Sequence, residues 1–427
     1  MNRLKPSRAC WALTALLALL PGTNSYAAGP ESLSFRATTQ QGRVSTSGLI
    51  QNSSALRASM QSKLSAAPLI MTPAGQPELL SFPEFSSSVA GRFSGRAPGG
   101  DLVFYTVQPE LQEYAETLVR STRSHHVAIA LMDPQTGRIL AVAGKSKSVP
   151  NPLLHDAVPA ASLFKVVTAA AALERASYSP LSKVYYRGGP YTLERWNYLP
   201  DPKRDRISMT LAEALGKSCN PVFGRIALKH LSAPVLQQYA RSFGFNQPLR
   251  ADFQLPASSA TIPSSAYELS RTAAGFGKVY MTPIHAVTFM STVANEGLIP
   301  RPHLIDEIYD SKGRQIYKGR TAVVGRAVNP RTASTLLDMM RYTTTVGTSR
   351  SEFMRSKYRS GFPVPVAAKT GTLRGTNPKG LNQWFIAAAP ISNPKIAVAI
   401  LVVDPANSSS KPSRMGRQLI ERALKTL

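Results

Sequence analysis

The residues best suited to do chemistry in this chain are a serine and a lysine three positions apart, Ser162 and Lys165. A serine hydroxyl is a poor nucleophile at neutral pH and needs a base within hydrogen-bonding distance. On a helix, residues three apart lie on the same face, so the Lys165 amine can reach the Ser162 hydroxyl. The pair therefore predicts acyl transfer through a covalent serine ester.

Two further motifs follow in order along the chain. Ser218 and Asn220 flank Cys219 and can supply a second hydroxyl and an amide, while the run Lys369-Thr370-Gly371-Thr372 can supply a cation, hydroxyls and strand backbone. Each motif is short enough to arise by chance, but the ordered set, each in a suitable context, indicates one functional site. Cys219 is expected to pack behind its two neighbours as a small hydrophobic residue.

The context of the first motif predicts a buried helix. Residues 163–174 are almost wholly apolar and rich in alanine, as in a helix that is covered on all sides. Ser162 then lies at the helix N-terminus, where unpaired N–H groups and the helix dipole favour a developing negative charge. A plain helix cap is the alternative role for this serine.

The third motif lies on one of several predicted strands. Alternating and apolar runs predict a five-stranded antiparallel sheet that is assembled from both ends of the domain. Gly371 would let a ligand backbone lie beside its strand. Between the two halves of the sheet, a mainly helical stretch of roughly 150–345 carries the first two motifs. The expected strands are 127–133, 138–143, 366–373, 382–389 and 395–403, and the expected covering helices are 110–121 and 417–425.

Composition divides the 427 residues into three parts. Residues 1–27 have a basic start, a short apolar core and a small-residue cleavage site, as in a secretory signal peptide. Residues 28–100 are rich in Ser, Ala, Gln and Gly and are interpreted as a low-complexity, mostly disordered linker. The ordered domain would then span 101–427. We expect an exported protein, periplasmic or on the outer face of the cytoplasmic membrane, with an uncleaved membrane anchor as the alternative to cleavage.

The net charge of +26 implies attraction to polyanions. For an exported protein, these are anionic envelope polymers or the membrane surface; no nucleic-acid-binding motif is present, so no nucleic acid is expected. Removal of the signal would take Cys10 and leave Cys219 without an intrachain disulfide partner. The histidines at 125, 126 and 155 lack the spacing of metal ligands, so we expect no metal and no cofactor.

The order of the three motifs resembles that of the penicillin-binding transpeptidases and serine β-lactamases. The resemblance covers about residues 101–425 and includes Val346-Gly347-Thr348 upstream of the third motif and Trp384-Phe385 on the next strand. It implies a three-layer α/β sandwich, with a five-stranded antiparallel sheet flanked by helices and a mainly helical subdomain.

The resemblance also implies roles for the motif residues. Ser162 would attack a D-alanyl-D-alanine peptidoglycan stem peptide, with Lys165 as the base because burial near Lys369 lowers its pKa. Ser218 would relay a proton to the leaving amine, and Asn220 would hold the substrate amide.

The third motif would bind the rest of the substrate. Lys369 would set the electrostatic field, and the hydroxyls of Thr370 and Thr372 would bind the terminal carboxylate. The backbone N–H groups of Ser162 and Thr372 would form the oxyanion hole. One departure from many relatives is Ala161, where they have a glycine before the nucleophile.

The expected activity is that of a monofunctional D,D-transpeptidase that cross-links peptidoglycan and is acylated by β-lactams. A D,D-carboxypeptidase differs only in the acyl acceptor and remains an alternative. A β-lactamase is disfavoured because Asp252 is the only acid between Asn246 and Pro263, where class A enzymes carry a glutamate motif. A non-catalytic β-lactam sensor is disfavoured because all the motif residues are intact.

Overall fold

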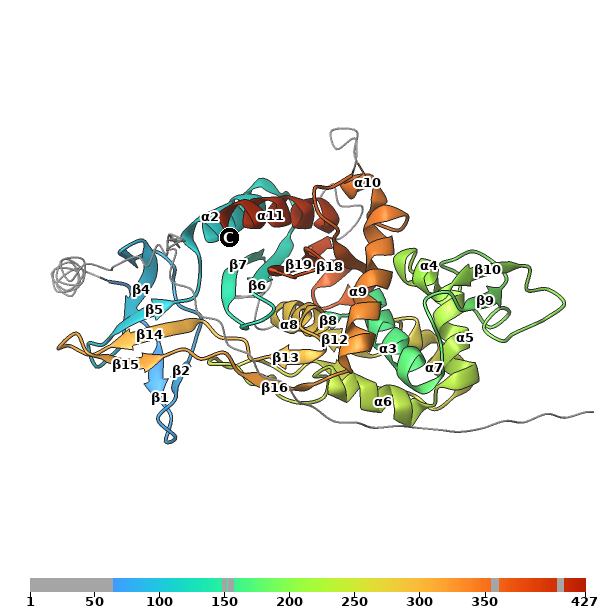
Figure 1. Cartoon of the computed structure of the whole chain (residues 1–427), viewed down its shortest axis with the longest axis horizontal. Helices are drawn as coiled ribbons and strands as arrows, with labels where there is room; N and C mark the ends of the chain where they lie inside the picture. Colours follow the sequence, from blue (N-terminus) through green and yellow to red (C-terminus); the bar gives the residue numbers. More distant parts are fainter. Residues whose placement is uncertain (1–63, 148–151, 153–156, 355–360, 405–410) are drawn as a thin grey trace, which may run out of the picture. The chain divides into compact units, whose positions relative to one another are not determined.

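The computed structural model describes residues 64–147, 152, 157–354, 361–404 and 411–427. All of them belong to one compact unit that spans Ile50–Leu427 (Figure 1). The predicted signal peptide at 1–27 lies outside the described residues. Among the helices that are described, none has both the length and the apolar character needed to cross a bilayer.

A five-stranded antiparallel sheet forms the centre of the domain, in the order β17-β18-β19-β6-β7. Its strands come from both ends of the domain, as predicted. They are β6 (His126–Met132), β7 (Ile139–Ser146), β17 (Ala367–Thr376), β18 (Lys379–Ala389) and β19 (Ile396–Asp404). The β17–β18 ladder continues to the pair Thr376 and Lys379, so both strands are longer than expected. The expected strands ended at 373 and began again at 382, whereas in the structure only residues 377 and 378 lie between β17 and β18.

Helices cover both faces of this sheet, which gives the three-layer sandwich (Figure 1). Helices α2 (Pro109–Ser121) and α11 (Pro412–Thr426) pack on one face and α8 (Pro283–Ala294) packs on the other. Strand β19 is buried on both sides because its side chains alternate between the layers. Val398 and Ile400 belong to the cluster under α2 and α11, whereas Ala399 and Leu401 belong to the cluster on the α8 side.

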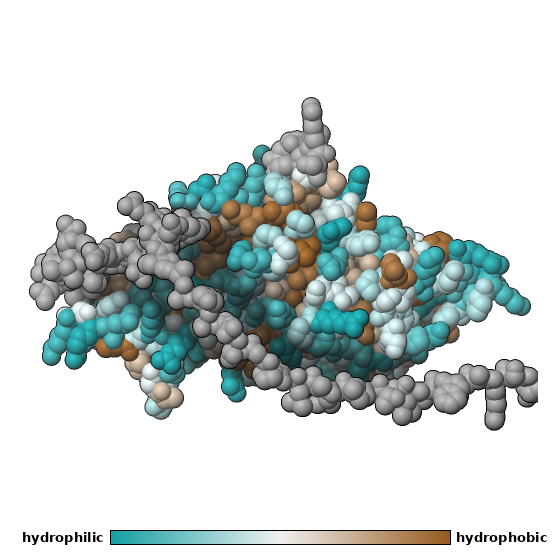
Figure 2. Space-filling view, in the orientation of Figure 1, coloured by the Kyte–Doolittle hydropathy of each residue, from teal (hydrophilic) through white to brown (hydrophobic). Residues whose placement is uncertain are grey.

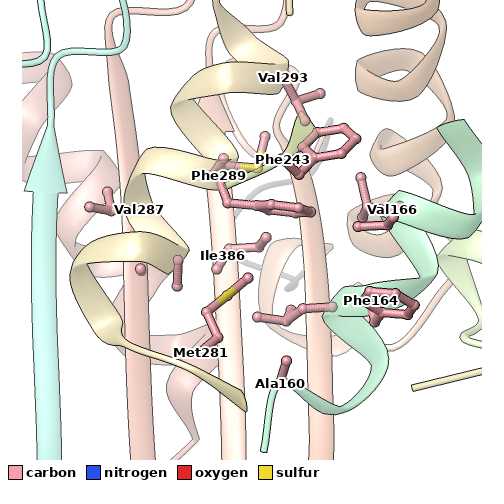
Figure 3. Close-up of a cluster of buried hydrophobic side chains, with 14 of the residues drawn as sticks. Ala160, Phe164, Val166, Phe243, Met281, Val287, Phe289, Val293 and Ile386 are labelled. Carbon is pink, nitrogen blue, oxygen red and sulfur yellow. The ribbon is translucent and has the colours of Figure 1, made fainter. Parts of the chain in front are cut away.

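The α8 layer joins the sheet to the helical part of the domain. Phe289 and Val293 of α8 lie in the same cluster as Ile386 of β18 and Phe164 beside the first motif (Figure 3). At the start of helix α8, the side chain of Thr282 accepts a hydrogen bond from the His285 N–H, and Pro283 lies in the first turn. Close packing here makes the helix that follows Ser162 part of the main core.

The middle of the chain is helical but also contributes strands. Its helices are a 3-10 turn (Ala161–Phe164), α3 (Lys165–Arg175), α4 (Leu211–Gly216), α5 (Asn220–His230), α6 (Ala233–Ser242), α7 (Ala266–Ala273), α9 (Pro330–Thr345) and α10 (Arg350–Phe353). Its strands are β8 (Val158–Pro159), β9 (Lys183–Tyr186), β10 (Ile207–Thr210), β11 (Ser259–Ala260), β12 (Val279–Met281), β13 (Leu298–Pro300), β14 (Ile305–Tyr309), β15 (Gln315–Lys318) and β16 (Val323–Arg326).

The expectation of a disordered linker over 28–100 is wrong for residues 64–100. This part forms strands, and a second five-stranded sheet has the order β15-β14-β5-β4-β3. This sheet takes β3 (Ser88–Val89), β4 (Arg92–Arg96) and β5 (Leu102–Tyr105) from the N-terminal part of the domain. Strands β1 (Leu69–Met71) and β2 (Pro77–Leu79) form a separate hairpin. The remainder of the predicted linker, 28–63, lies outside the described residues.

Contacts with distant parts of the chain explain the order in residues 64–100. Leu79 is completely buried, and its backbone N–H donates to the carbonyl of Asp252 at 2.7 Å. Phe82 packs edge-on against Phe253, with ring centroids 5.2 Å apart. Arg92 forms a salt bridge with Glu307 at 2.7 Å. These short strands are therefore held by partners some 200 residues away, which local composition does not indicate.

Candidate active site

The first motif forms the predicted nucleophile and base. Ser162 lies in the 3-10 turn that leads directly into α3, and Lys165 is the first residue of α3. The Lys165 Nζ atom lies 2.8 Å from Ser162 Oγ. Ser162 is partly exposed to a cleft of about 580 Å³, whereas Lys165 is completely buried. The hydroxyl can therefore meet a substrate while the amine stays shielded from water.

Burial lowers the pKa of Lys165 to about 7. Its Nζ also contacts Asn220 Oδ1 at 2.7 Å and the carbonyl oxygen of Ala274. Both of these oxygens can only accept hydrogen bonds. A neutral amine has two N–H bonds, and donating them to Asn220 and Ala274 leaves its lone pair for the Ser162 hydroxyl. The arrangement therefore suits a general base.

The second motif lies between α4 and α5. Asn220 is the first residue of α5, and its Nδ2 donates to the carbonyl of Tyr191 at 2.7 Å, which fixes the amide so that Oδ1 faces Lys165. Ser218 has a φ of 58°, in the left-handed region, and is buried except for the edge that lines the cleft. Cys219 is completely buried, which agrees with its expected packing role.

The third motif brings a second buried amine to the site. The Lys369 Nζ donates to Ser218 Oγ at 2.9 Å and to the carbonyl of Thr370 at 2.7 Å. Burial lowers its pKa well below the usual value, and the nearby charge of Lys165 lowers it further. The two lysines therefore influence each other electrostatically. Lys165 contacts Ser162 and Asn220, and Lys369 contacts Ser218. The sequence-predicted side chains of all three motifs meet in one site.

Strand β17 forms a wall of the cleft. Thr370 and Thr372 both line it, and the hydroxyl oxygens of Thr370 and Thr348 lie 2.6 Å apart. Gly371, between the two threonines, faces the start of the turn that carries Ser162. A Cβ there would lie 3.1 Å from the carbonyl oxygen of Ala160 and 3.3 Å from the Ala161 Cβ. The glycine therefore allows the strand and the nucleophile's turn to approach closely.

The turn before the nucleophile is unusually tight. Ala161 has a φ of 50°, the conformation in which glycine is usually found. Gly275 packs against this turn, and a Cβ on it would lie 2.2 Å from the Ala161 carbonyl oxygen. The alanine where many relatives have a glycine therefore adopts the glycine-like conformation, which the surrounding structure holds in place.

Several residues around the site were not predicted to be functional. Tyr191 and Ala274 act through backbone carbonyls, which any residue type could supply. The N-terminus of α11 lines the cleft with Lys411 and Ser413, and Gln383 of β18 faces it as well. Of the additional residues that line the cleft, Thr348 was named in the sequence analysis, as part of the turn upstream of the third motif. A residue that acts through its backbone leaves no signal in its own type.

Comparison with known proteins agrees with this geometry. The profile of the penicillin binding protein transpeptidase domain matches residues 127–421. The chain belongs to the penicillin-binding protein transpeptidase family. The chain is also 31% identical over 388 residues to the peptidoglycan D,D-transpeptidase PbpA of Mycobacterium tuberculosis, with 80% of this chain and 76% of that protein covered. The corresponding protein of Mycolicibacterium smegmatis is 29% identical over 384 residues, with the same shares of both proteins covered.

Solved structures of this family share the fold. The crystal structure of PBPA from Mycobacterium tuberculosis superposes with a TM-score of 0.63 at 28% identity, covering 77% of this chain and 83% of the other. A D,D-transpeptidase domain from Eggerthella lenta gives a TM-score of 0.64 at 22% identity, with 84% and 95% covered, which supports the fold alone. The family and the three-layer fold expected from the sequence are therefore confirmed.

Proposed function

We propose that this penicillin-binding protein is a serine D,D-transpeptidase that cross-links peptidoglycan stem peptides ending in D-alanyl-D-alanine. The observation that carries the proposal is the 2.8 Å contact between Ser162 Oγ and a buried lysine amine whose pKa is about 7. A substantial fraction of such an amine is neutral at physiological pH, and the neutral form can take the proton of the attacking hydroxyl. The β-lactams would be its covalent inhibitors.

In the acylation step, Ser162 Oγ attacks the carbonyl carbon of the penultimate D-alanine while its proton passes to Lys165. The peptide C–N bond then breaks, and the departing D-alanine nitrogen receives a proton through Ser218. The Ser218 hydroxyl suits this relay because Lys369 donates a hydrogen bond to it at 2.9 Å. The acyl group remains on Ser162 as an ester until the amine of a second stem peptide displaces it.

The remaining motif residues would bind and polarise the substrate. Asn220 would hold the substrate amide, and the hydroxyls of Thr370 and Thr372 would bind the terminal carboxylate. Lys369 would add positive potential at the same place. The N–H groups of Ser162 and Thr372 would form the oxyanion hole, where the loss of one donor typically costs about 3 kcal/mol. Gly371 keeps this strand close enough to the nucleophile's turn for both donors to act on one oxygen.

The relatives support this assignment. Two of them carry the name peptidoglycan D,D-transpeptidase. Penicillin-binding protein A of Mycobacterium tuberculosis has been solved as acyl-enzymes with penicillin G and with imipenem, and both structures match this chain at TM-scores near 0.6. The same serine chemistry would let β-lactams acylate Ser162 here.

The proposed place of action is outside the cytoplasm, where stem peptides are cross-linked. We propose that residues 1–27 direct export to the periplasm or to the outer face of the cytoplasmic membrane, as their signal-like sequence predicts. The net charge of +26 would favour contact with anionic envelope polymers or with the membrane surface.

Product analysis with a purified D-alanyl-D-alanine stem peptide tests the proposal. With an added acceptor amine, a transpeptidase should release D-alanine and form the new amide. Release of D-alanine with hydrolysis alone, even at high amine concentration, would identify a D,D-carboxypeptidase instead. Rapid turnover of penicillin would identify a β-lactamase. An acyl-enzyme with penicillin but no reaction with any peptide would identify a sensor.

A further inference from the structure

A second groove lies on the segment that projects beside α5. We call residues 178–210 the arm; it comprises the β9–β10 hairpin and the long loop that joins its strands (Figure 1). A groove of about 460 Å³ runs along the arm and is here called the arm groove. Its lining includes Tyr178, Tyr185, Lys183, Arg206 and Lys229. The catalytic mechanism above uses none of these residues.

The arm is a rigid platform. The buried guanidinium of Arg225, on α5, pairs with the buried carboxylate of Asp205 and donates to the carbonyls of Tyr185, Asn197 and Leu199 at 2.7, 2.9 and 3.1 Å. Arg187 also pairs with Asp205, at 3.1 Å. A surface that is ordered in advance loses little conformational entropy when a ligand binds.

This rigid platform exposes large apolar side chains and positive charge. Tyr185 is 58% exposed and Trp196 is 55% exposed. Lys183, Arg206 and Lys229 are exposed on the groove, and none of them is in a salt bridge within the part of the chain that the structure describes. Figure 2 shows hydrophobic atoms among the hydrophilic ones where β9 and β10 lie. The acid in the groove, Asp205, is already neutralised by two arginines.

The arm groove is connected to the active site through α5 and through the loop of the arm. Asn220, at the start of α5, lines the catalytic cleft, whereas Arg225 and Lys229 of the same helix line the arm groove. At 1.5 Å per residue, they lie about 8 and 14 Å along the helix from Asn220. Tyr191 at the near end of the loop also lines the cleft and accepts the Asn220 amide hydrogen bond.

We propose that the arm groove binds the glycan strand of peptidoglycan, so that it holds the polymer whose stem peptide reacts at Ser162. This inference rests on the proposed function. Sugar rings present C–H faces that pack against aromatic side chains such as Tyr185, and the basic rim complements the carboxylates of neighbouring stem peptides. The concave shape of the groove fits a polymer strand, whereas a membrane surface would be contacted by exposed side chains of the arm outside the groove, such as Trp196.

Binding to insoluble peptidoglycan tests this proposal. The purified full chain is sedimented with sacculi that hydrofluoric acid has stripped of phosphodiester-linked polymers. The triple variant Lys183→Gln, Arg206→Gln, Lys229→Gln should bind about tenfold more weakly at physiological salt. The matched control Lys312→Gln, Lys318→Gln, Arg320→Gln removes the same charge from exposed positions around β15 and should bind within about twofold of the wild type. Tyr185→Ala should also weaken binding, whereas Tyr185→Phe should retain it.

Other outcomes would overturn the proposal. An equal loss of sacculus binding in both triple variants would mean that general charge attraction holds the protein. Unchanged binding in the groove variant would show that the groove does not bind the glycan strand. Binding only to unstripped sacculi would indicate an anionic wall polymer. The same variants are also sedimented with anionic phospholipid vesicles. If the groove variant lost binding to the vesicles but not to the sacculi, the groove would bind a membrane surface.

The rate of acylation by penicillin separates this test from the proposed function. It should be unchanged in both triple variants, because neither touches the catalytic cleft. Sacculus binding should also persist in Ser162→Ala, which cannot be acylated. The wild-type chain could fail to be acylated and still bind sacculi more tightly than the groove variant does. The proposed function would then fail, while the groove would remain a glycan site.

Discussion

Ser162 Oγ lies 2.8 Å from Lys165 Nζ, and the two residues are separated by only one turn of helix. The amine is completely buried, and its other two hydrogen-bond partners are oxygens that can only accept. Solvent cannot stabilise a positive charge on this lysine, so the protein favours the neutral form that can act as a base.

Replacement of the nucleophile should abolish covalent labelling. Ser162→Ala removes the only hydroxyl that contacts Lys165 Nζ among the described residues. Fluorescent penicillin should therefore not label the variant, and intact-mass measurement should detect no adduct. Ser218→Ala is the control, because it removes the hydroxyl of the second motif and should slow acylation without preventing it. Persistent labelling of Ser162→Ala would falsify the assignment of the nucleophile.

Acylation by penicillin should depend on pH with a midpoint near 7. The pKa of Lys165 is lowered to about 7 by burial, so the neutral base is lost as the pH falls through this value. The rate should fall about tenfold per unit below the midpoint and level off above it. Lys165→Ala should lower the rate by about 10²–10⁴-fold and remove this dependence. A flat profile between pH 5 and 8 for the wild type would show that another group is the base.

The tight turn before Ser162 should be sensitive to a single methyl group. Gly275→Ala would place a Cβ 2.2 Å from the Ala161 carbonyl oxygen at a φ of +92°. The turn must then move, so acylation should slow at least about tenfold and the protein should be destabilised by more than about 1 kcal/mol. The matched control is Gly313→Ala, at a φ of +77° with no atom within 4 Å of the added Cβ.

The control isolates the cost of the backbone conformation. Gly313→Ala should lose about 1 kcal/mol and keep the wild-type acylation rate, because nothing blocks the added methyl group. Urea unfolding and penicillin labelling measure the two effects. Equal acylation rates in Gly275→Ala and Gly313→Ala would mean that the turn tolerates displacement.

The ion pair under the arm should be essential to its stability. Arg225 and Asp205 have side chains that are 3% and 5% exposed. Arg225→Met would leave the Asp205 carboxylate buried with only Arg187 beside it, at a cost of about 3–5 kcal/mol in the free energy of unfolding. Adding Asp205→Asn removes the carboxylate that has lost its buried partner and should recover part of the loss. Urea unfolding of both variants measures this, and a double variant less stable than Arg225→Met would contradict the explanation.

Residues 64–100 should contribute to the stability of the domain. A chain that starts at Leu64 keeps Leu79 in its buried position and the contact between Phe82 and Phe253. A chain that starts at Asp101 loses both, together with strands β1, β2, β3 and β4, and should be less stable by at least about 3 kcal/mol. Thermal unfolding of the two purified chains compares them directly. Equal stability of the two chains would mean that these strands do not stabilise the domain.

The sequence alone determined the chemistry and the central architecture. Short motifs name their side chains directly, so Ser162, Lys165, Ser218, Asn220 and Lys369 were all expected, and the structure brings them together. The strands of the central sheet were also predictable, because each is a continuous apolar or alternating run whose period is local. A buried helix after Ser162 followed from its alanine-rich composition for the same reason.

Only the tertiary structure decided the features that depend on distant partners. Residues 64–100 read as a linker because their short strands have no strong local pattern, yet Arg92 pairs with Glu307 across more than 200 residues. The carbonyls of Ala274 and Tyr191 orient Lys165 and Asn220, and a backbone oxygen is the same in every residue type. Local sequence records side-chain chemistry and period, whereas backbone acceptors, long-range strand pairing and the burial that sets the pKa of Lys165 exist only once the chain has folded.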